Sequence, residues 1–313
     1  METPLTEAVS LLPSVEESPM CSQYSKEIGL DPRGTALNID AVLLVEVPLP
    51  WPKPVFDHPF LNGLESLIHT SMGTTRVLAS QPREGNQRAS ATVFHREEAT
   101  INRWDFPLGN GTSLTELIDN LISSNPKSLD SKKSTNGKEA ILLCTQGSHD
   151  ICCGSKGTRL AELIETHDND IELFKVSHLG GHRFSPTAMT MPDGRMWAGL
   201  DLETIFSILG KKIEVEKVAK LCRGWIGAAK GPEQIAEIEI FKQTGWELDK
   251  QKREILTRAF DNRWSIEITV EDKKWLVCIR KGREVPTITC RSEGGLPFTT
   301  ANEYIVDSVE KIS

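Results

Sequence analysis

Hydrophobic and polar positions along this chain alternate between short apolar runs and stretches with a helical period. The near-continuous apolar run from Ala36 to Val47 ends in a proline-rich stretch, which is typical of a strand buried on both faces. Further along, apolar positions at three-to-four spacing predict helices over residues 59–69 and 114–122. Short apolar runs predict strands over residues 75–79 and 91–94. The pattern therefore predicts an N-terminal α/β half over residues 36–125.

Two stretches show neither period. Residues 1–35 mix Pro, Ser, Glu and Gly, which predicts a loosely ordered N-terminal segment. Residues 123–138 read SSNPKSLDSKKSTNGK, a polar and turn-rich sequence with almost no apolar anchor. We therefore place a linker at residues 126–138.

A second α/β unit is predicted beyond this linker. A buried-type strand over 139–144 is followed by a helix over 157–165 and a second strand over 171–176. The sequence Pro192-Asp193-Gly194 predicts the turn of a hairpin. Three helices complete this unit, which covers residues 139–245; they are 202–209, 215–221 and 232–242.

The last part of the chain, residues 246–313, is predicted to be a small α+β region. Apolar and polar residues alternate over 264–270, 274–279 and 285–290, as they do in an antiparallel meander. Residues 302–311 have the spacing of a closing helix. Together with the two preceding units, this region gives an α/β fold class for the whole chain.

Composition narrows the classes of function. The 313 residues carry 36 Lys and Arg against 44 Asp and Glu, a net charge of −8, so the overall field does not attract nucleic acid or anionic lipid. Apolar runs are too short for a membrane span, and the acidic N-terminus does not resemble a secretion or transit signal. The seven cysteines, an odd number, fit a reducing compartment, so we expect a cytoplasmic protein.

Two clusters of metal-ligating residues each follow a predicted buried strand, which is where α/β folds place their sites. The first, CTQGSHDICCG, contains Cys144 and Cys153, and the second, SHLGGH, contains His178 and His182. Two glycines between the histidines predict a tight loop rather than a helix. If both loops lie at the same edge of the sheet, two thiolates and two imidazoles form a four-ligand set.

The chemistry of this set leaves alternatives open. Thiolate and imidazole ligands suit Zn²⁺ or an iron-sulfur cluster. Eight residues separate Cys144 from Cys153, a loop wider than that of most structural zinc sites, which favours a larger group such as a two-iron cluster. A third possibility is a thiol oxidoreductase that uses the adjacent Cys152 and Cys153, although the chain has no Cys-x-x-Cys motif.

The other cysteines and the basic residues near these loops are expected to have ordinary roles. Cys278 and Cys290 fall on apolar positions of predicted strands, and Cys222 lies among helix residues, so we expect core packing; Cys21 lies in the N-terminal segment and has no evident role. Four basic residues are expected to be solvated rather than to dock an acidic electron donor: Lys156, Arg159, Arg183 and Arg195.

These motifs resemble those of the sucrase/ferredoxin-like family. The similar segments are CTQGSHDICCG (144–154), SHLGGHRFSPT (177–187), Met191-Pro-Asp-Gly194 and Arg223-Gly224, with weaker similarity upstream, so that roughly residues 20–245 are covered. Where the family often has His in the first motif, this chain has Gln146. The resemblance implies a thioredoxin-like ferredoxin domain over 139–245.

The resemblance also implies a [2Fe-2S] cluster bound by Cys144, Cys153, His178 and His182. Two neutral imidazoles in place of two thiolates leave the site less negative, which makes an added electron easier to accept; Rieske centres lie at about −150 to +300 mV against about −400 mV for plant-type ferredoxins. Reduction would raise the proton affinity of the free imidazole nitrogens, so electron transfer is expected to be proton-coupled. We therefore expect a soluble electron carrier with a redox partner protein rather than a substrate-specific enzyme, with a zinc protein or a thioredoxin-like thiol oxidoreductase as alternatives.

Overall fold

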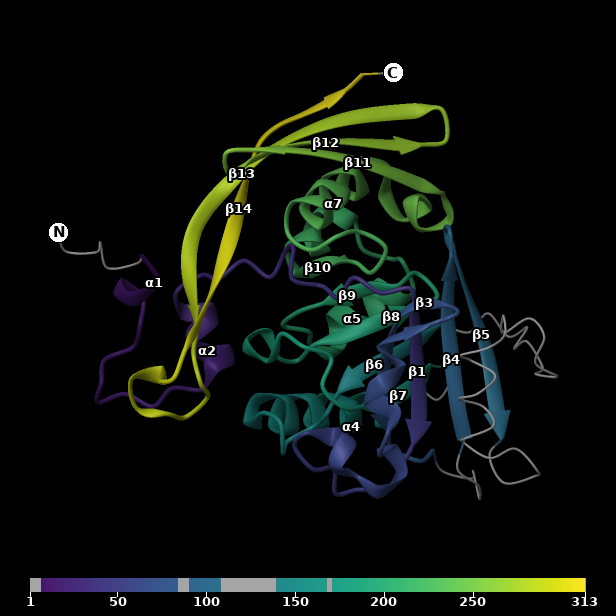
Figure 1. Ribbon diagram of the computed structural model, residues 1–313, viewed down its shortest axis with the longest axis vertical. Coiled ribbons are helices and arrows are strands. Elements are labelled where there is room, and N and C mark those ends of the chain that lie inside the picture. Colours follow the sequence, from purple (N-terminus) through teal and green to yellow (C-terminus); the bar gives the residue numbers. More distant parts are fainter. Residues whose placement is uncertain (1–6, 84–89, 108–138, 168–170, 313) are drawn as a thin grey trace.

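A large mixed β-sheet forms the centre of the molecule (Figure 1). The computed structural model describes residues 7–83, 90–107, 139–167 and 171–312. In the described residues the sheet order is β10-β9-β8-β6-β7-β3-β1-β4-β5, with β2 added on β3. The strands are β1 (Ala41–Glu46), β2 (His69–Thr70), β3 (Gly73–Ser80), β4 (Ser90–Glu97), β5 (Thr100–Pro107), β6 (Ala140–Cys144), β7 (Glu172–Val176), β8 (Ala188–Met191), β9 (Arg195–Trp197) and β10 (Cys222–Trp225).

The two halves expected from the sequence share this one sheet. Strands β1 and β3 of the first half pair in parallel, as do β6 and β7 of the second. The halves meet where β3 pairs with β7 in antiparallel direction, at Ser80 and Val176. The linker placed at 126–138 and the helix expected at 114–122 lie outside the described residues.

The second half follows the predicted order of elements. Strand β6 leads through a loop to α4 (Thr158–His167) and then to the parallel strand β7, and β8 and β9 form the hairpin around Pro192-Asp193-Gly194. The predicted helices are present as α5 (Leu202–Leu209), α6 (Val215–Val218) with a following 3₁₀ turn (Ala219–Leu221), and α7 (Pro232–Thr244). The α/β class is confirmed, and a β-α-β unit followed by a hairpin is compatible with a thioredoxin-like half.

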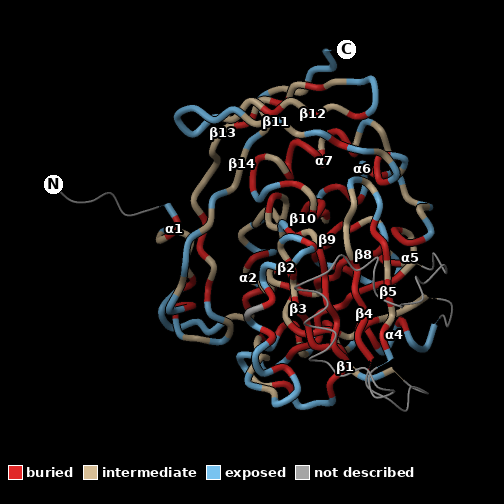
Figure 2. The backbone as a smooth tube through the Cα atoms, turned by 45° about the vertical axis from the view of Figure 1, so that its right-hand side comes forward, coloured by how far each residue is buried: buried red, intermediate tan, exposed pale blue. Residues whose placement is uncertain are grey.

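The central strands are buried on both faces, as the apolar runs predicted. All six residues of β1 and all five of β6 are buried, and Figure 2 shows this buried interior surrounded by exposed loops. In the first half, residues 59–69 form 3₁₀ turns (Pro59–Leu61 and Leu64–Ile68) rather than an α-helix. Among the described residues, no helix has the length and apolar character needed to cross a membrane.

The C-terminal region is a four-stranded antiparallel sheet. Its strands are β11 (Arg253–Phe260), β12 (Arg263–Val270), β13 (Lys273–Thr287) and β14 (Thr299–Lys311). The helix predicted at 302–311 is wrong, because this segment pairs along β13 as β14. Its β-branched residues Ile305, Val306 and Val309 fit a strand better than a helix once a partner strand is available.

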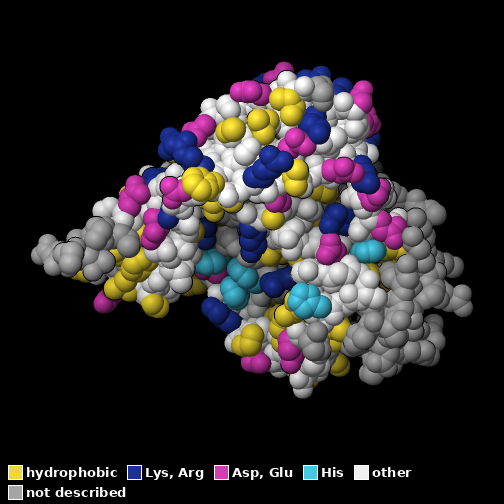
Figure 3. All heavy atoms as spheres, turned by 45° about the horizontal axis from the view of Figure 1, so that its top comes forward, with side chains coloured by type: hydrophobic (Ala, Val, Ile, Leu, Met, Phe, Trp, Pro, Cys, Tyr) yellow, Lys and Arg dark blue, Asp and Glu magenta, His cyan; other side chains and the backbone are white. Residues whose placement is uncertain are grey.

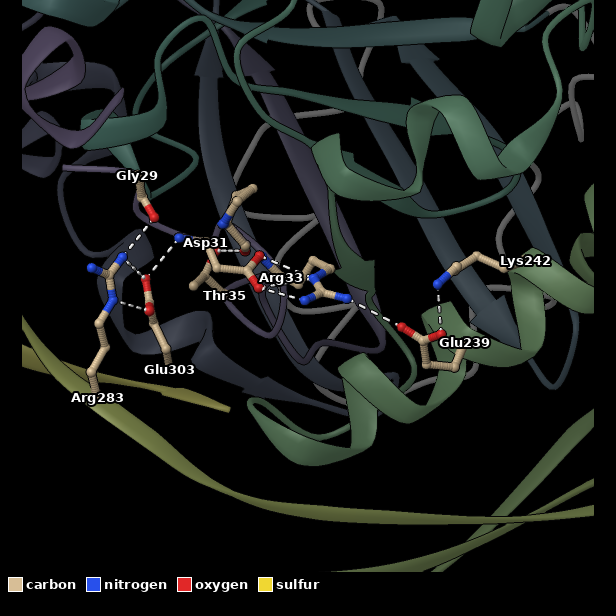
Figure 4. Close-up of polar contacts among 9 residues, drawn as sticks. Gly29, Asp31, Arg33, Thr35, Glu239, Lys242, Arg283 and Glu303 are labelled. Carbon is tan, nitrogen blue, oxygen red and sulfur yellow. Dashed lines mark hydrogen bonds and ion pairs between the residues drawn. The ribbon is translucent and has the colours of Figure 1, made fainter. Parts of the chain in front are cut away.

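Strands β13 and β14 extend as a long two-stranded ribbon beside the N-terminal segment (Figure 1). That segment was expected to be loosely ordered, but from Glu7 onward it carries α1 (Glu7–Ser10) and α2 (Cys21–Glu27). Figure 4 shows how the two parts are joined: Arg283 donates to the Gly29 carbonyl at 2.6 Å, and Glu303 accepts from the backbone N–H of Asp31 at 2.8 Å. Arg33 continues the network to Glu239 of α7 at 3.1 Å.

A buried ion network joins the large sheet to the C-terminal sheet. Arg195 of β9, expected to be solvated, has no exposed surface and lies 2.9 Å from Glu237 of α7 and 2.7 Å from Asp249. Arg253 at the start of β11 binds the same Glu237, so one carboxylate serves two guanidinium groups. The guanidinium of Arg195 also stacks on the Phe241 ring at 3.4 Å. Because these charges are out of water, each depends on its partners for compensation.

We predict that Glu237→Gln destabilises the protein by about 3–5 kcal/mol, because two buried arginines lose their shared counter-charge. Urea unfolding followed by circular dichroism measures this difference. The control is Glu247→Gln, since Glu247 forms a solvent-exposed pair with Lys250 and its loss should leave the unfolding midpoint close to that of the wild type. Equal effects of the two substitutions would contradict the role given to the network.

Candidate metal centre

The loop after β6 is folded closely on itself, and this brings Cys153 back towards Cys144. Residues Cys153–Gly157 form a π-helical turn that leads into α4. A Cβ on Gly154 would lie 2.4 Å from the Cα of Gly147, and a Cβ on Gly157 would lie 2.0 Å from the carbonyl oxygen of Cys144. Only glycine allows the backbone to pass this close, so the loop conformation depends on these positions.

Three of the four predicted ligands lie together. Ligand atoms of Cys144, Cys153 and His178 are all within 4.8 Å of one another, and both thiols are fully buried. The Cys153 thiol donates to Cys144, which together with His178 lowers the pKa of the Cys144 thiol well below its usual range. The same hydrogen bond, with burial, raises the pKa of Cys153. The two pKa values therefore move in opposite directions, and either sulfur would bind a metal as the thiolate.

Hydrogen bonds fix the backbone of His178 and leave Nδ1 of its ring available to a metal. Its N–H donates to Oε1 of Gln146 at 3.1 Å, and its carbonyl accepts from Arg76 at 2.7 Å. Its Nδ1 is buried and has no hydrogen-bond partner among the described residues. Since buried polar atoms are normally satisfied, an unsatisfied nitrogen on a ring that lies beside two sulfurs fits a metal-containing group.

A second imidazole covers this ring. The rings of His149 and His178 are stacked with centroids 3.6 Å apart. Burial, with the nearby His178, lowers the pKa of His149 to about 4, so His149 is neutral at physiological pH. An uncharged ring beside His178 shields it from water without adding a positive charge.

His182 lies next to this group but faces a different direction. Its ring centroid is 5.9 Å from that of His178, and its Nδ1 lies 2.9 Å from Oδ2 of Asp150 and 3.2 Å from Sγ of Cys21. When the N–H at Nδ1 donates a hydrogen bond to Asp150, Nε2 keeps its lone pair for a metal. The compact three-residue group does not include His182, so the predicted four-ligand set is wider than the ligand shell of a single ion.

The glycines between the two histidines form the tight loop that was predicted. Gly180 and Gly181 have φ values of 79° and 72°, in the left-handed region that favours glycine. A Cβ on Gly181 would lie 2.6 Å from the guanidinium carbon of Arg223. Arg223 also donates to the carbonyl of Gly180 at 2.9 Å, so this buried arginine fixes the loop that carries both histidines.

One buried and two half-buried arginines give the site a positive environment. Burial, with the nearby Arg183, lowers the pKa of Arg223 to about 10, a value at which it is still charged, and the thiols of Cys144 and Cys153 act in the opposite direction. Burial likewise lowers the pKa of Arg183 and Arg76, which interact electrostatically with Cys21 and Cys144 respectively. Figure 3 shows His side chains gathered beside Lys and Arg side chains on a hollowed face of the molecule. Positive charges around buried sulfurs favour thiolates and added negative charge.

Comparison with known proteins agrees with the motifs on these two loops. A sequence model of the family described as sucrase/ferredoxin-like matches residues 32–224, more than half of the chain. The chain belongs to the sucrase/ferredoxin-like family. No curated protein and no solved structure gave a match. Both loops lie inside the range that matches the family.

The structure also contains a second group of possible metal ligands, which the sequence did not predict. Atoms of Cys21, Asp150, Cys152 and Cys290 all lie within 4.8 Å of one another. Core packing was expected for Cys290 and no role for Cys21; both pack in a small buried cluster with Cys152 and Ile288, and their sulfurs also lie in this group. Cys152 meets Cys21, which is 131 positions earlier in the chain, and Cys290, which is 138 positions later. Nothing in the local sequence of these residues indicates the contact. The adjacent cysteines, Cys152 and Cys153, were the only available signal.

We predict that Gly157→Ala reduces metal binding at Cys144 and Cys153, because the new methyl group would collide with the Cys144 carbonyl. A displacement of this backbone should cost about 2 kcal/mol or more of stability and lower the metal content per chain several-fold. Elemental analysis and urea unfolding measure both effects.

Gly210→Ala is the matched control. Its Cβ would meet first the flexible side chain of Lys212, at 3.2 Å, and α5 would retain its geometry. Wild-type metal content in Gly157→Ala would show that the loop does not need this close approach.

Proposed function

We propose that this protein is an electron carrier whose [2Fe-2S] cluster is bound by Cys144, Cys153, His178 and His182. The observation that carries the proposal is the position of the His178 ring beside two buried sulfurs, with a buried Nδ1 that has no hydrogen-bond partner among the described residues. Membership of the sucrase/ferredoxin-like family supports the same reading. The ligands come from the ends of β6 and β7, which are parallel neighbours, so both loops open at the same edge of the sheet.

When bound, such a cluster would accept and release single electrons. The chain's own residues prepare the site for that role. Asp150 holds the proton on Nδ1 of His182, which leaves Nε2 available as a ligand. Gln146 links the two loops, because its Oε1 accepts from His178 and its Nε2 donates to the Pro52 carbonyl at 2.7 Å. These contacts keep the ligands in place when the charge of the site changes.

The surrounding charges favour a potential above that of a four-thiolate ferredoxin. Two neutral imidazoles remove negative charge from the ligand set, and the buried Arg223 with the half-buried Arg76 and Arg183 adds positive charge nearby. Both effects stabilise the reduced state. We infer a redox partner protein as donor or acceptor, and the cytoplasm as the compartment, which the seven free cysteines of the structure would suit.

One observation favours a zinc site as the second candidate. Cys144, Cys153 and His178 are close enough to bind a single ion, with water or His182 in a fourth position. Such a site would be colourless and redox-silent. A thiol oxidoreductase based on Cys152 and Cys153 has less support, since the two thiols belong to different groups of neighbours.

We predict that protein purified without oxygen contains about two irons and two sulfides per chain at these residues and gives a Rieske-like EPR signal after reduction. His182→Cys should retain the iron and lower the reduction potential by on the order of 100 mV or more, because a thiolate replaces a neutral imidazole. Spectroelectrochemistry followed by EPR measures the shift.

His167→Cys is the matched control, since His167 lies exposed at the end of α4 and contacts Phe206. Its potential should equal that of the wild type. Zinc near one per chain at Cys144 and Cys153, with no chromophore after attempted cluster reconstitution, would refute the electron carrier and support the second candidate.

A further inference from the structure

The second group of ligand atoms joins three distant parts of the chain. Cys21 begins α2, Asp150 and Cys152 lie in the loop after β6, and Cys290 follows the long ribbon strand β13. Figure 1 shows the lower end of the ribbon reaching the neighbourhood of α2. The backbone N–H of Arg291 donates to the carbonyl of Pro19 at 2.9 Å, which fixes Cys290 next to Cys21.

The distances within this group suit one tetrahedral metal ion. Sγ of Cys21 lies 3.6 Å from Sγ of Cys152, which lies 3.5 Å from Sγ of Cys290. A zinc ion with Zn–S bonds of about 2.3 Å places its sulfurs about 3.8 Å apart. A disulfide would need about 2.05 Å, so these thiols are neighbours and not bonded pairs. The carboxylate oxygens of Asp150, 3.7 and 3.8 Å from Sγ of Cys21, occupy a fourth direction.

The hydrogen bonds around the sulfurs already stabilise negative charge. The Cys21 thiol donates to Sγ of Cys152 at 3.6 Å. The backbone N–H of Cys21 donates to Sγ of Cys290 at 3.4 Å. The guanidinium of Arg183, which interacts electrostatically with Cys21, has a buried Nε without a hydrogen-bond partner among the described residues. N–H donors and an adjacent cation are typical of the surroundings of metal-bound thiolates.

We propose that Cys21, Cys152, Cys290 and Asp150 bind one Zn²⁺ ion that ties α2, the loop after β6 and the C-terminal ribbon together. Three soft thiolates and one carboxylate form a closed tetrahedral set with no open position, which is the character of a structural zinc site. Each thiol that becomes a ligand releases its proton to solvent as the ion sheds water. This site has ligands of its own and does not rest on the proposed iron-sulfur centre, although Asp150 and Cys21 also contact His182.

The experiment uses the full chain, supplied with zinc during expression and purified without oxygen. Zinc and iron are counted per chain, and zinc-edge X-ray absorption reports the ligands. Wild-type protein should hold one zinc with about three sulfur neighbours near 2.3 Å and one oxygen. Cys290→Ser and Cys21→Ser should each lower the zinc content at least several-fold. Cys290→Ser should also leave the iron content unchanged, whereas Cys21 contacts His182 at 3.2 Å and is used for the zinc count alone.

Cys278→Ser is the matched control, because Cys278 lies half-buried on the same strand β13 but outside the group. It should retain both metals. A folded wild-type chain without zinc, a zinc content that survives both substitutions, or a disulfide among these cysteines in the oxygen-free protein would each overturn the proposal.

The iron count keeps the two proposals distinguishable. Zinc that depends on Cys21 and Cys290 in a chain without an iron-sulfur cluster would support this inference while refuting the electron carrier. A cluster with no such zinc would do the reverse. Zinc with two sulfur and two nitrogen neighbours would place the metal at Cys144, Cys153 and the histidines, and would overturn this proposal.

Discussion

The peptide bond between Cys152 and Cys153 connects the two groups of thiols, and the rest of the centre depends on the divergence of these two side chains. Cys153 faces Cys144 and His178, whereas Cys152 faces Cys21 and Cys290. The π-helical turn that begins at Cys153, and the glycine contacts behind it, hold this divergence. A shift of the loop that served one group would therefore displace a thiol of the other.

Asp150 connects the same two groups through hydrogen bonds. Its Oδ1 accepts from the backbone N–H of Cys152 at 2.8 Å, and its Oδ2 lies 2.9 Å from Nδ1 of His182. Asp150, a member of the second group, thus orients His182 beside the first group. Burial raises the pKa of Asp150, but the contact with His182 outweighs this and the pKa is lowered. The buried guanidinium of Arg223 lies nearby, so the negative charges of the thiolates and the carboxylate are balanced by a positive charge that water does not screen.

The sequence predicted the part of the centre that follows from strand ends. Cys144 ends a buried strand, His178 follows another, and Gly180-Gly181 signalled a tight loop, so four ligands were expected to meet. Cys144, Cys153 and His178 do, whereas His182 lies beside this group and outside it. Local patterns could not reveal Cys21 and Cys290, because their contact depends on the ribbon of β13 and β14 packing beside the N-terminal segment. The same long-range pairing turned an expected helix into β14. Arg195 was misjudged because a charged residue in a short strand indicates solvent unless its counter-charges, on α7 and after it, are known.

The family match covers the first group completely and the second group only in part. Residues 32–224 include Cys144, Asp150, Cys152, Cys153 and both histidines, while Cys21 and Cys290 lie outside that range on opposite sides. The range shared with the family therefore contains every residue needed for a Cys/His centre, whereas the second group is complete only when both flanking segments fold back onto the loop after β6. The flanking segments have their own reason to do so, since Arg283, Glu303 and the backbone of Asp31 already hold them together. An ion among the three thiols would add a strong link at the far end of the same contact, at the point where the ribbon reaches the site loop.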